Sequence, residues 1–267
     1  MRFANLLLLL LVFLTGCAKL HRDRVRFEQL SHCPKETTQT LTARQDEFGP
    51  LSETQTLECA LEALRGHDDP SLRRRPLASR VCLNLAERNP DPGKREKLAA
   101  EGVDFAEAAV ALGADGDGAV HYYLAANLGL MVRDDITLAL ANLPRLEAEM
   151  KRAVELSPDI DHGGPLRLLG MLYLKAPPWP TGIGDGDKAL DLLKRAVEKH
   201  PDHPLNQLFY AQALWEVEGE DAAAQVNAGM ATAMKLLQEG NWGYSKEPWK
   251  KEFAELEAEI RSDSSPQ

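Results

Sequence analysis

The sequence predicts an all-α protein, an irregular solenoid of stacked helical hairpins with about ten helices. Two observations carry this prediction. The five residues at 151–155, Lys-Arg-Ala-Val-Glu, recur unchanged at 194–198, and a proline follows each copy at the same distance, at Pro158 and Pro201. From Ser52 onward the apolar residues keep helical spacing, interrupted by Pro and Gly, with no alternating run that would form a strand. Self-similarity at a fixed spacing is typical of repeat proteins.

The apolar spacing divides the chain after residue 51 into helices that end near Pro, Gly and capping residues. We expect them at residues 54–65, 74–88, 94–112, 120–131, 144–156, 165–175, 187–199, 204–217, 221–239 and 248–260. First turns tolerate proline, and we place four prolines there: Pro144, Pro165, Pro204 and Pro248. Residues 241–260, with Trp242 and Trp249, are expected to cap the stack.

The N-terminus predicts export and a lipid anchor. After Arg2, residues 6–14 form an unbroken apolar run, which is too short to span a bilayer but fits a signal peptide. The run ends in Leu14-Thr15-Gly16-Cys17, which resembles a bacterial lipobox. The resemblance implies cleavage before Cys17 and acylation of its thiol, which gives lasting membrane attachment. An ordinary signal peptide with a chance cysteine is the alternative.

The residue after Cys17 is Ala18 and not Asp, which by the sorting habit of such lipoproteins implies the periplasmic face of the outer membrane in a diderm bacterium. We therefore expect a signal peptide at 1–16, a flexible lipid-anchored tether at 17–51 and the helical repeat domain at 52–267. The tether begins with a basic cluster that can contact anionic head groups. Simple solvation of that cluster is the preferred interpretation.

Three cysteines remain once Cys17 is acylated, and an exported protein can oxidise them. Cys59 and Cys82 lie equally far on either side of the expected turn near Pro70, so a hairpin would bring them to one level. We expect a Cys59–Cys82 disulfide. A pairing of Cys33, or buried free thiols, are the alternatives.

One pair of helices carries a recognisable motif. Leu169-Gly170 and Tyr173 on the first helix, with Ala189, Leu193, Ala196 and Pro201 on the second, resemble the tetratricopeptide repeat. The small residues let neighbouring helices approach closely. The resemblance covers residues 118–230 well, but the copies lie 43 positions apart, against about 34 in the standard repeat. The extra residues fall in the loop at 176–185.

A narrower resemblance covers residues 166–193. Leu-Gly-x-Leu-Tyr, a Pro-Trp-Pro segment and a Gly-Asp before Ala-Leu-x-Leu-Leu are similar to the T component of tripartite ATP-independent periplasmic (TRAP) transporters. The resemblance implies a lipoprotein of irregular hairpins that associates with a periplasmic solute-binding protein as an accessory of solute transport. The alternative is a scaffold for envelope or outer-membrane protein assembly.

Composition and motifs argue against other classes of function. With 31 Lys and Arg against 41 Asp and Glu, the net charge of −10 disfavours nucleic acid as a partner. We find no zinc spacing and no nucleophile motif, so we expect no catalytic site, metal or cofactor. The glycine-rich stretch at 182–186 lacks the strand that precedes a dinucleotide site, and Asp115-Gly116-Asp117-Gly118 lacks the closing Glu of a calcium loop.

A binding groove is therefore the expected functional site. In tetratricopeptide proteins the first helix of each hairpin lines the concave face, and the register carries this role to Tyr123, Asn127, Leu130, Arg167, Met171, Leu174, Leu208, Gln212 and Trp215. Such a groove suits a protein segment or a small apolar ligand. Core burial is the alternative, above all for Leu174, Leu208 and Trp215. Trp179 either anchors a partner or folds back over its hairpin, and assembly into a homo-oligomer remains open.

Overall fold

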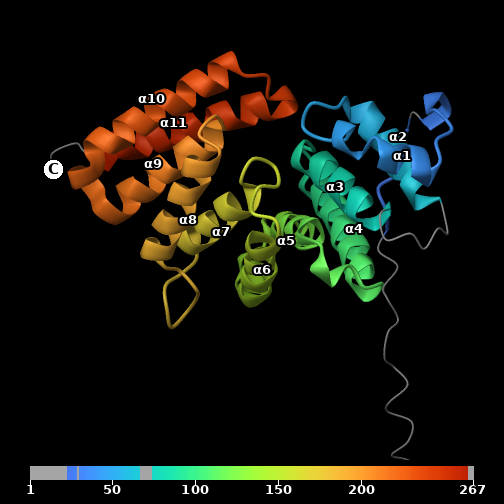
Figure 1. Cartoon of the computed structure of the whole chain (residues 1–267), viewed down its shortest axis with the longest axis horizontal. Coiled ribbons are helices and arrows are strands. Elements are labelled where there is room, and N and C mark those ends of the chain that lie inside the picture. Colours follow the sequence, from blue (N-terminus) through green and yellow to red (C-terminus); the bar gives the residue numbers. More distant parts are fainter. Residues whose placement is uncertain (1–22, 29, 67–73, 264–267) are drawn as a thin grey trace, which may run out of the picture.

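The computed structural model describes residues 23–28, 30–66 and 74–263, with side chains as far as residue 261. Within these ranges the chain is helical, and its only extended pairing is an isolated bridge between Pro178 and Gly184. The all-α prediction is confirmed. Helices follow one another along the long axis of a curved stack, with α2 near one end and α10 and α11 at the other (Figure 1).

All ten expected helices form, preceded by a short extra helix, α1. Their bounds are α1 Thr38–Ala43, α2 Thr54–Arg65, α3 Arg74–Glu87, α4 Pro92–Ala111, α5 Gly118–Val132, α6 Ile136–Leu156, α7 Gly164–Lys175, α8 Gly186–Lys199, α9 Pro204–Glu218, α10 Ala223–Glu239 and α11 Lys246–Asp263. Antiparallel pairs in chain order, such as α3 with α4 and α7 with α8, form the hairpins.

One helix start was predicted wrongly. α6 begins at Ile136, and Pro144 lies inside the helix instead of in its first turn. The start is set by Asp135, whose carboxylate accepts hydrogen bonds from the backbone N–H groups of Thr137 and Leu138. Pro144 is exposed, so the helix passes through it with the missing backbone hydrogen bond on the solvent side.

An aspartate caps the second helix of each of three successive hairpins. Asp91, Asp135 and Asp185 precede α4, α6 and α8, and each carboxylate accepts at least one N–H of the first turn. Such a cap contributes about 1 kcal/mol of helix stability. The caps define where each hairpin turn ends, and they place a row of carboxylates beside the turns.

Small residues set the spacing between the helices. A Cβ at Gly170 of α7 would lie 2.6 Å from Cγ of Leu193 in α8, so the two helices meet where α7 has no side chain. The alanines of the repeated pentapeptide, Ala153 and Ala196, are both fully buried. The two copies therefore occupy equivalent places in α6 and α8, as the repeat predicts.

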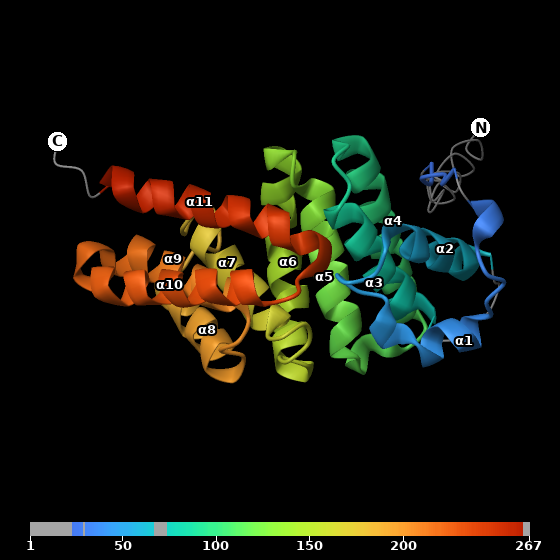
Figure 2. The same cartoon turned by 90° about the horizontal axis from the view of Figure 1, so that it is seen from above.

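The expected tether at 17–51 is folded over most of its described length, so that prediction is wrong there. α1 and the turn after it bury Leu41 and Phe48 in the same hydrophobic cluster as α2, α3 and α4. The physical reason is the apolar content of the segment. Leu41 and Phe48 pack into the first hydrophobic cluster and Cys33 bonds to Cys59, which stabilises the fold of a segment that is otherwise polar. This segment (blue) lies against α2 and α3 in Figure 2.

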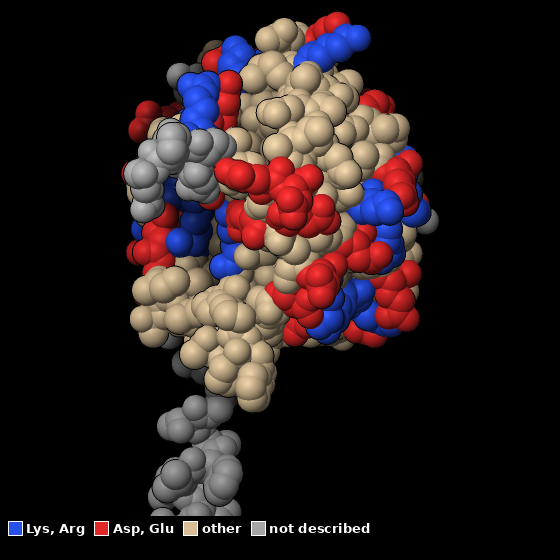
Figure 3. Space-filling model, turned by 90° about the vertical axis from the view of Figure 1, so that its left-hand side faces the viewer, with Lys and Arg blue, Asp and Glu red and all other residues tan. Residues whose placement is uncertain are grey.

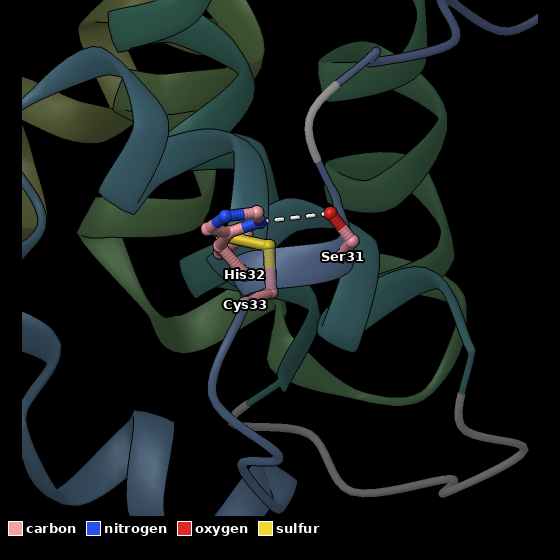
Figure 4. The surroundings of a disulfide bond; sticks show 4 residues. Ser31, His32 and Cys33 are labelled. Carbon is pink, nitrogen blue, oxygen red and sulfur yellow. Dashed lines mark hydrogen bonds between the residues drawn. A yellow bond between two sulfur atoms is a disulfide. The ribbon is translucent and has the colours of Figure 1, made fainter.

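The disulfide also differs from the expected pairing. Cys59 bonds to Cys33, with the two Cα atoms 5.3 Å apart, and Cys82 is a free thiol. Cys82 lies in α3, which is covered on most sides, and its side chain is fully buried in the core. Cys59 lies on the face of α2 that meets the short turn Leu30–His32. This turn brings Cys33, which follows it, within bonding distance of Cys59 (Figure 4).

The C-terminal helix packs back on the last hairpin. Phe253 and Leu256 of α11 are buried against Leu205 and Leu208 of α9 and Leu237 of α10. The segment before α11 also reaches the first hairpin, because the Tyr244 hydroxyl donates a hydrogen bond to the Glu87 carboxylate at the end of α3. The segment between α10 and α11 is thus in contact with the end of α3.

Candidate functional site

Most of the expected groove is core, so the groove prediction is wrong at these positions. Tyr123, Asn127, Arg167, Leu208 and Trp215 are buried, with at most 8% of each residue exposed. Neighbouring helices cover the faces of the first helices that carry these residues, so residues expected on an open face fill the seams between helices. Burial of Leu208 and Trp215 was the alternative that the sequence had left open.

Asn127 holds two helices together. Its amide nitrogen donates to the Ser79 carbonyl of α3 at 3.0 Å and to the Tyr123 carbonyl of α5 at 2.8 Å. On its other side it faces Gly102 of α4, where any Cβ would collide with the Asn127 amide. Burial also raises the pKa of the neighbouring Tyr123 hydroxyl, so that side chain is neutral. Both residues are structural.

Arg167 supports a strained turn between α6 and α7. Asp161 and His162 adopt left-handed backbone conformations, with φ of 46° and 53°, which cost non-glycine residues roughly 1–2 kcal/mol each. Their carbonyls accept hydrogen bonds from the Arg167 guanidinium, which also donates to Oδ1 of Asn206 at 2.7 Å. Asn206 in turn donates to the His162 carbonyl at 3.0 Å. These hydrogen bonds offset the backbone strain, so the role of Arg167 is structural.

Two histidines and two tryptophans cluster where α9 meets the segment before α11. The ring of His203 stacks on His162 at 5.8 Å and meets Trp242 and Trp249 edge-on, each at 5.3 Å. Burial, with the nearby positive charge of Arg167, lowers the pKa of His203 to about 2. The Nδ1 atom of His203 is buried without a hydrogen-bond partner. Trp242 and Trp249 therefore pack the start of α11 against the neutral imidazole of His203.

Four of the predicted groove residues keep part of their surface open. Leu130, Met171, Leu174 and Gln212 are half-buried. Met171 and Gln212 lie one helical turn before Lys175 and Glu216, which join α7 to α9 by an ion pair of 2.5 Å. Both therefore lie on a stripe that leads towards the loop after α7. This stripe is the part of the predicted groove that a partner can reach.

The loop between α7 and α8 presents Trp179 to solvent, with 85% of the residue exposed. The loop is held by its own backbone: the N–H groups of Thr181 and Gly182 donate to the Pro178 carbonyl, each at 3.1 Å. The N–H of Gly184 donates to the Pro177 carbonyl at 2.8 Å. The second of the two alternatives, folding back over the hairpin, is therefore wrong, because these bonds turn the tryptophan outward.

Two glycines make this loop possible. A Cβ at Gly182 would collide with the Pro177 carbonyl oxygen, and one at Gly184 would collide with the Ala176 carbonyl oxygen. The stretch that superficially resembles a dinucleotide motif is thus explained by close backbone approach within the loop. Asp185 then caps α8 by accepting the N–H of Lys188 at 3.1 Å.

Other exposed apolar residues lie on the same side of the stack. Val217 at the end of α9 packs against Gly186 at the start of α8. Ala139 of α6 and Leu172 of α7 belong to one hydrophobic cluster, so the start of α6 lies beside the end of α7. We call the exposed apolar residues of these helix ends the turn edge: Ile136, Leu138, Leu140, Trp179 and Val217, which are 73%, 48%, 41%, 85% and 39% exposed.

Of the residues of the turn edge, only Trp179 was predicted from the sequence as a candidate for binding. The start assigned to α6 was the cause, because Ile136, Leu138 and Leu140 precede Pro144 and were left outside any helix. Asp135 was the signal that would have found them, since an aspartate before an apolar run predicts a helix start. Val217 carried no signal of its own.

Negative charge surrounds the turn edge. Lys175 and Lys188 pair with Glu216 and Asp185. Four further acids at the ends of α8 and α9 are exposed and make no ion pair within the described part of the chain: Asp187, Glu218, Glu220 and Asp221. Figure 3 shows the α8–α11 end of the molecule, where acidic side chains (red) spread between uncharged areas (tan). An anionic surface would be repelled here.

Other kinds of site find little support. A cavity of about 450 Å³ opens near the start of α5, but small and polar residues line it: Thr42, Gln45, Pro76, Gly113, Ala114, Gly116 and Asp117. No cluster of three potential metal ligands occurs in the residues described. Over the same residues, none of the helices has the length and apolar character needed to cross a bilayer. The lipidation prediction at Cys17 falls outside the described residues.

Comparison with known proteins gives no further guidance. No model of a known protein family matches the sequence, and no curated protein is significantly similar to it.

Proposed function

We propose that the protein is a lipid-anchored periplasmic adaptor that binds another protein through the turn edge. It acts as a binding protein without a catalytic centre or cofactor. The observation that carries this proposal is Trp179, a tryptophan 85% exposed on a loop with a fixed backbone. Tryptophan is enriched among the few residues that dominate interface energy, and a pre-formed loop loses little entropy when it binds.

The chemistry around Trp179 specifies the partner. The turn edge is apolar, whereas the exposed carboxylates of Asp187, Glu218 and Glu220 beside it are negative. A complementary surface has an apolar pocket for the indole and a rim of Lys and Arg. Charge complementarity of this kind accelerates and orients association. An anionic membrane is disfavoured at this surface by the same carboxylates.

The sharper form of the proposal makes the partner a periplasmic solute-binding protein, as the resemblance to the T component of TRAP transporters implies. The runner-up is a scaffold for envelope or outer-membrane protein assembly. Both use the same edge, so the identity of the bound protein discriminates between them. A small apolar ligand is a weaker candidate because Tyr123, Leu208 and Trp215 are buried and leave no apolar groove at their positions.

Photo-crosslinking tests the proposal directly. A photoreactive phenylalanine analogue replaces Trp179 in the full-length protein in its own cells, and the adduct is identified by mass spectrometry. The identified protein is then purified, and its affinity for wild type and for Trp179→Ala is measured. Truncation of a central tryptophan costs about 2 kcal/mol or more, so we expect the affinity to fall by roughly 30-fold. Added salt should weaken binding of the wild type.

Leu112→Ala is the matched control. Leu112 is 44% exposed at the end of α4, on the side of the stack opposite the hairpin turns, so its truncation should leave the affinity unchanged. Adducts only with lipid, or only with a second copy of the chain, would contradict the proposal. Equal loss of affinity in Leu112→Ala and Trp179→Ala would also contradict it.

A further inference from the structure

The first described residues are fixed to the body of the protein. The Arg24 guanidinium lies 3.3 Å from the Glu101 carboxylate of α4. Arg65 of α2 donates to the Val25 carbonyl at 3.0 Å, and its guanidinium lies 5.0 Å from the centre of the Phe27 ring. Segment 23–28 therefore lies along α2 and α4 and does not move independently of them.

A buried ion pair anchors this attachment. Arg65 donates two hydrogen bonds to Glu101, at 2.9 and 2.6 Å, and the two side chains are only 7% and 6% exposed. Paired hydrogen bonds of this kind fix the geometry of both groups. Val25 and Phe27 add apolar contact with the first hydrophobic cluster. Segment 23–28 is thus held by charge, hydrogen bonds and packing at once.

Further along, the disulfide prevents the segment from extending away. Cys33 is bonded to Cys59 of α2, and Leu41 of α1 and Phe48 are buried in the core. Little of the chain between Arg24 and α2 can be drawn out as a spacer. The free length between the lipid anchor and the body is therefore set by the residues that precede residue 24.

We propose that the end of the molecule formed by segment 23–28, α2 and α4 is held against the head groups of the membrane. This inference rests on the proposed acylation of Cys17. Arg24 is the seventh residue after Cys17, and seven residues of chain span at most about 25 Å whatever their conformation. A free tether up to residue 51 would have reached roughly 120 Å.

Basic side chains at this end can contact anionic phospholipid head groups, although exposed Asp23 and Glu28 in the same segment balance the charge of Arg24 and Arg26. Arg24 is 52% exposed even though it contacts Glu101. Arg26 is exposed and makes no ion pair among the described residues. The sequence adds Lys19 and Arg22 between them and the anchor. Basic residues so close to a bilayer attract anionic lipid by about 1 kcal/mol each.

The attachment also gives the molecule a direction. Segment 23–28, α2 and α4 lie towards one end of the long axis, and the loop between α7 and α8 lies in the other half (Figures 1 and 2). The loop that carries Trp179 therefore lies in the half of the molecule away from the anchored end. The short connection between Cys17 and Arg24 therefore limits the distance from the membrane at which a partner can bind this loop.

Energy transfer to the bilayer tests the inference. The full-length lipoprotein is reconstituted into vesicles of phosphatidylethanolamine and phosphatidylglycerol that carry a head-group acceptor dye. A donor is attached through an unnatural amino acid at Arg26 or, in a second preparation, at the exposed Lys194 of α8. We expect several-fold stronger transfer from position 26. Omitting phosphatidylglycerol should lower the transfer from position 26 only slightly, because the acyl chains remain.

A spacer variant provides the control. A Gly/Ser insert of about 20 residues between Arg22 and Asp23 adds roughly 25 Å of root-mean-square length. Transfer from position 26 should then fall towards that from position 194. Equal transfer from both positions in the unmodified protein, or no change on insertion, would overturn the inference alone. A protein that fails to float with the vesicles would overturn the lipid anchor and this inference together.

Discussion

The hydroxyl of Tyr244 donates a hydrogen bond to the carboxylate of Glu87, which joins the segment before the last helix to the end of α3. The Arg88 guanidinium lies over the Tyr244 ring, 4.1 Å from its centre. Beside them Gly243, with φ of 55°, packs against the backbone of Pro50. In an open solenoid each repeat contacts only its neighbours. Here the first and last hairpins share a contact.

Loss of this contact should cost stability without unfolding the protein. We expect Tyr244→Phe to lower the free energy of unfolding by about 1 kcal/mol. Glu87→Gln should have a similar effect. Because the two groups act on each other, the double variant should lose less than the two single losses combined. Urea unfolding measures all three values, and strictly additive losses would mean that Tyr244 and Glu87 do not interact.

Arg167→Ala should destabilise the fold. The truncation leaves the Asp161 carbonyl and the Asn206 amide oxygen without their donor, whereas the His162 carbonyl keeps its hydrogen bond from Asn206. Each buried unsatisfied group costs roughly 1–3 kcal/mol, so we expect a loss of about 3 kcal/mol or more in thermal or urea unfolding. Lys194→Ala, on the solvent side of α8, is the control and should stay within about 0.5 kcal/mol of wild type.

Gly184→Ala tests whether partner affinity depends on the conformation of the loop or on the Trp179 side chain alone. An alanine Cβ would collide with the Ala176 carbonyl, so the loop must rearrange while Trp179 itself is retained. We expect a helical circular dichroism signal like that of wild type and partner affinity reduced as far as in Trp179→Ala. Wild-type affinity in Gly184→Ala would show that the indole alone, and not its presentation, is recognised.

Acidification should reveal the neutral imidazole of His203. Its pKa falls to about 2 in the folded protein because burial disfavours the charge, whereas in the unfolded chain it is about 6.5. Between these values the unfolded state binds a proton that the folded state does not. Stability therefore falls as the pH falls below about 6.5, by up to about 1.4 kcal/mol per pH unit for this group.

His203→Phe keeps an aromatic ring between Trp242 and Trp249 and removes the titration. Its stability should depend less steeply on pH than that of wild type between pH 6 and pH 4, a window taken from the two pKa limits. Urea unfolding at stepped pH measures the difference. Parallel pH profiles for the two proteins would mean that His203 is protonated in the folded state. The charged neighbours that act on it, Arg167, His162 and His200, are unchanged in this variant.

The disulfide should matter more than the free thiol. Cys33→Ser opens a loop closed over 26 residues, which chain-entropy arguments value at about 3 kcal/mol. The Cys33→Ser melting temperature should fall to that of reduced wild type. Cys82→Ala fills the same buried position with a smaller side chain and should cost less. An equal loss in both variants would contradict the Cys33–Cys59 pairing.

The helical hairpins were predictable because they depend on local signals. Apolar spacing, first-turn prolines and the repeated pentapeptide fix α7, α8 and α9 to within a residue or two of their observed ends. The prediction failed where two signals competed. Pro144 favoured a helix start, but the cap at Asp135 determined it, so the exposed residues Ile136 and Leu140 went unnoticed.

The candidate site was less predictable because exposure is a property of the packed structure. The register placed Arg167 and Trp215 on first helices correctly, yet which face of a helix stays open depends on how far the neighbouring helices turn around it. Trp179 was identified by its prolines alone, and its outward orientation depends on backbone bonds within the loop. The contact between Tyr244 and Glu87 left no trace in the sequence pattern.

If the protein is exported as proposed, the order of its cysteines determines which thiols can be oxidised first. If the polypeptide crosses a membrane N-terminus first, Cys33 and Cys59 both emerge before Cys82. The native bond can therefore close between consecutive cysteines while the later thiol is still on the other side. By the time Cys82 arrives, Cys33 and Cys59 are already bonded to each other, and Cys82 becomes buried in the core around α3. Oxidative folding in this order requires no disulfide isomerase, because no earlier bond has to be exchanged.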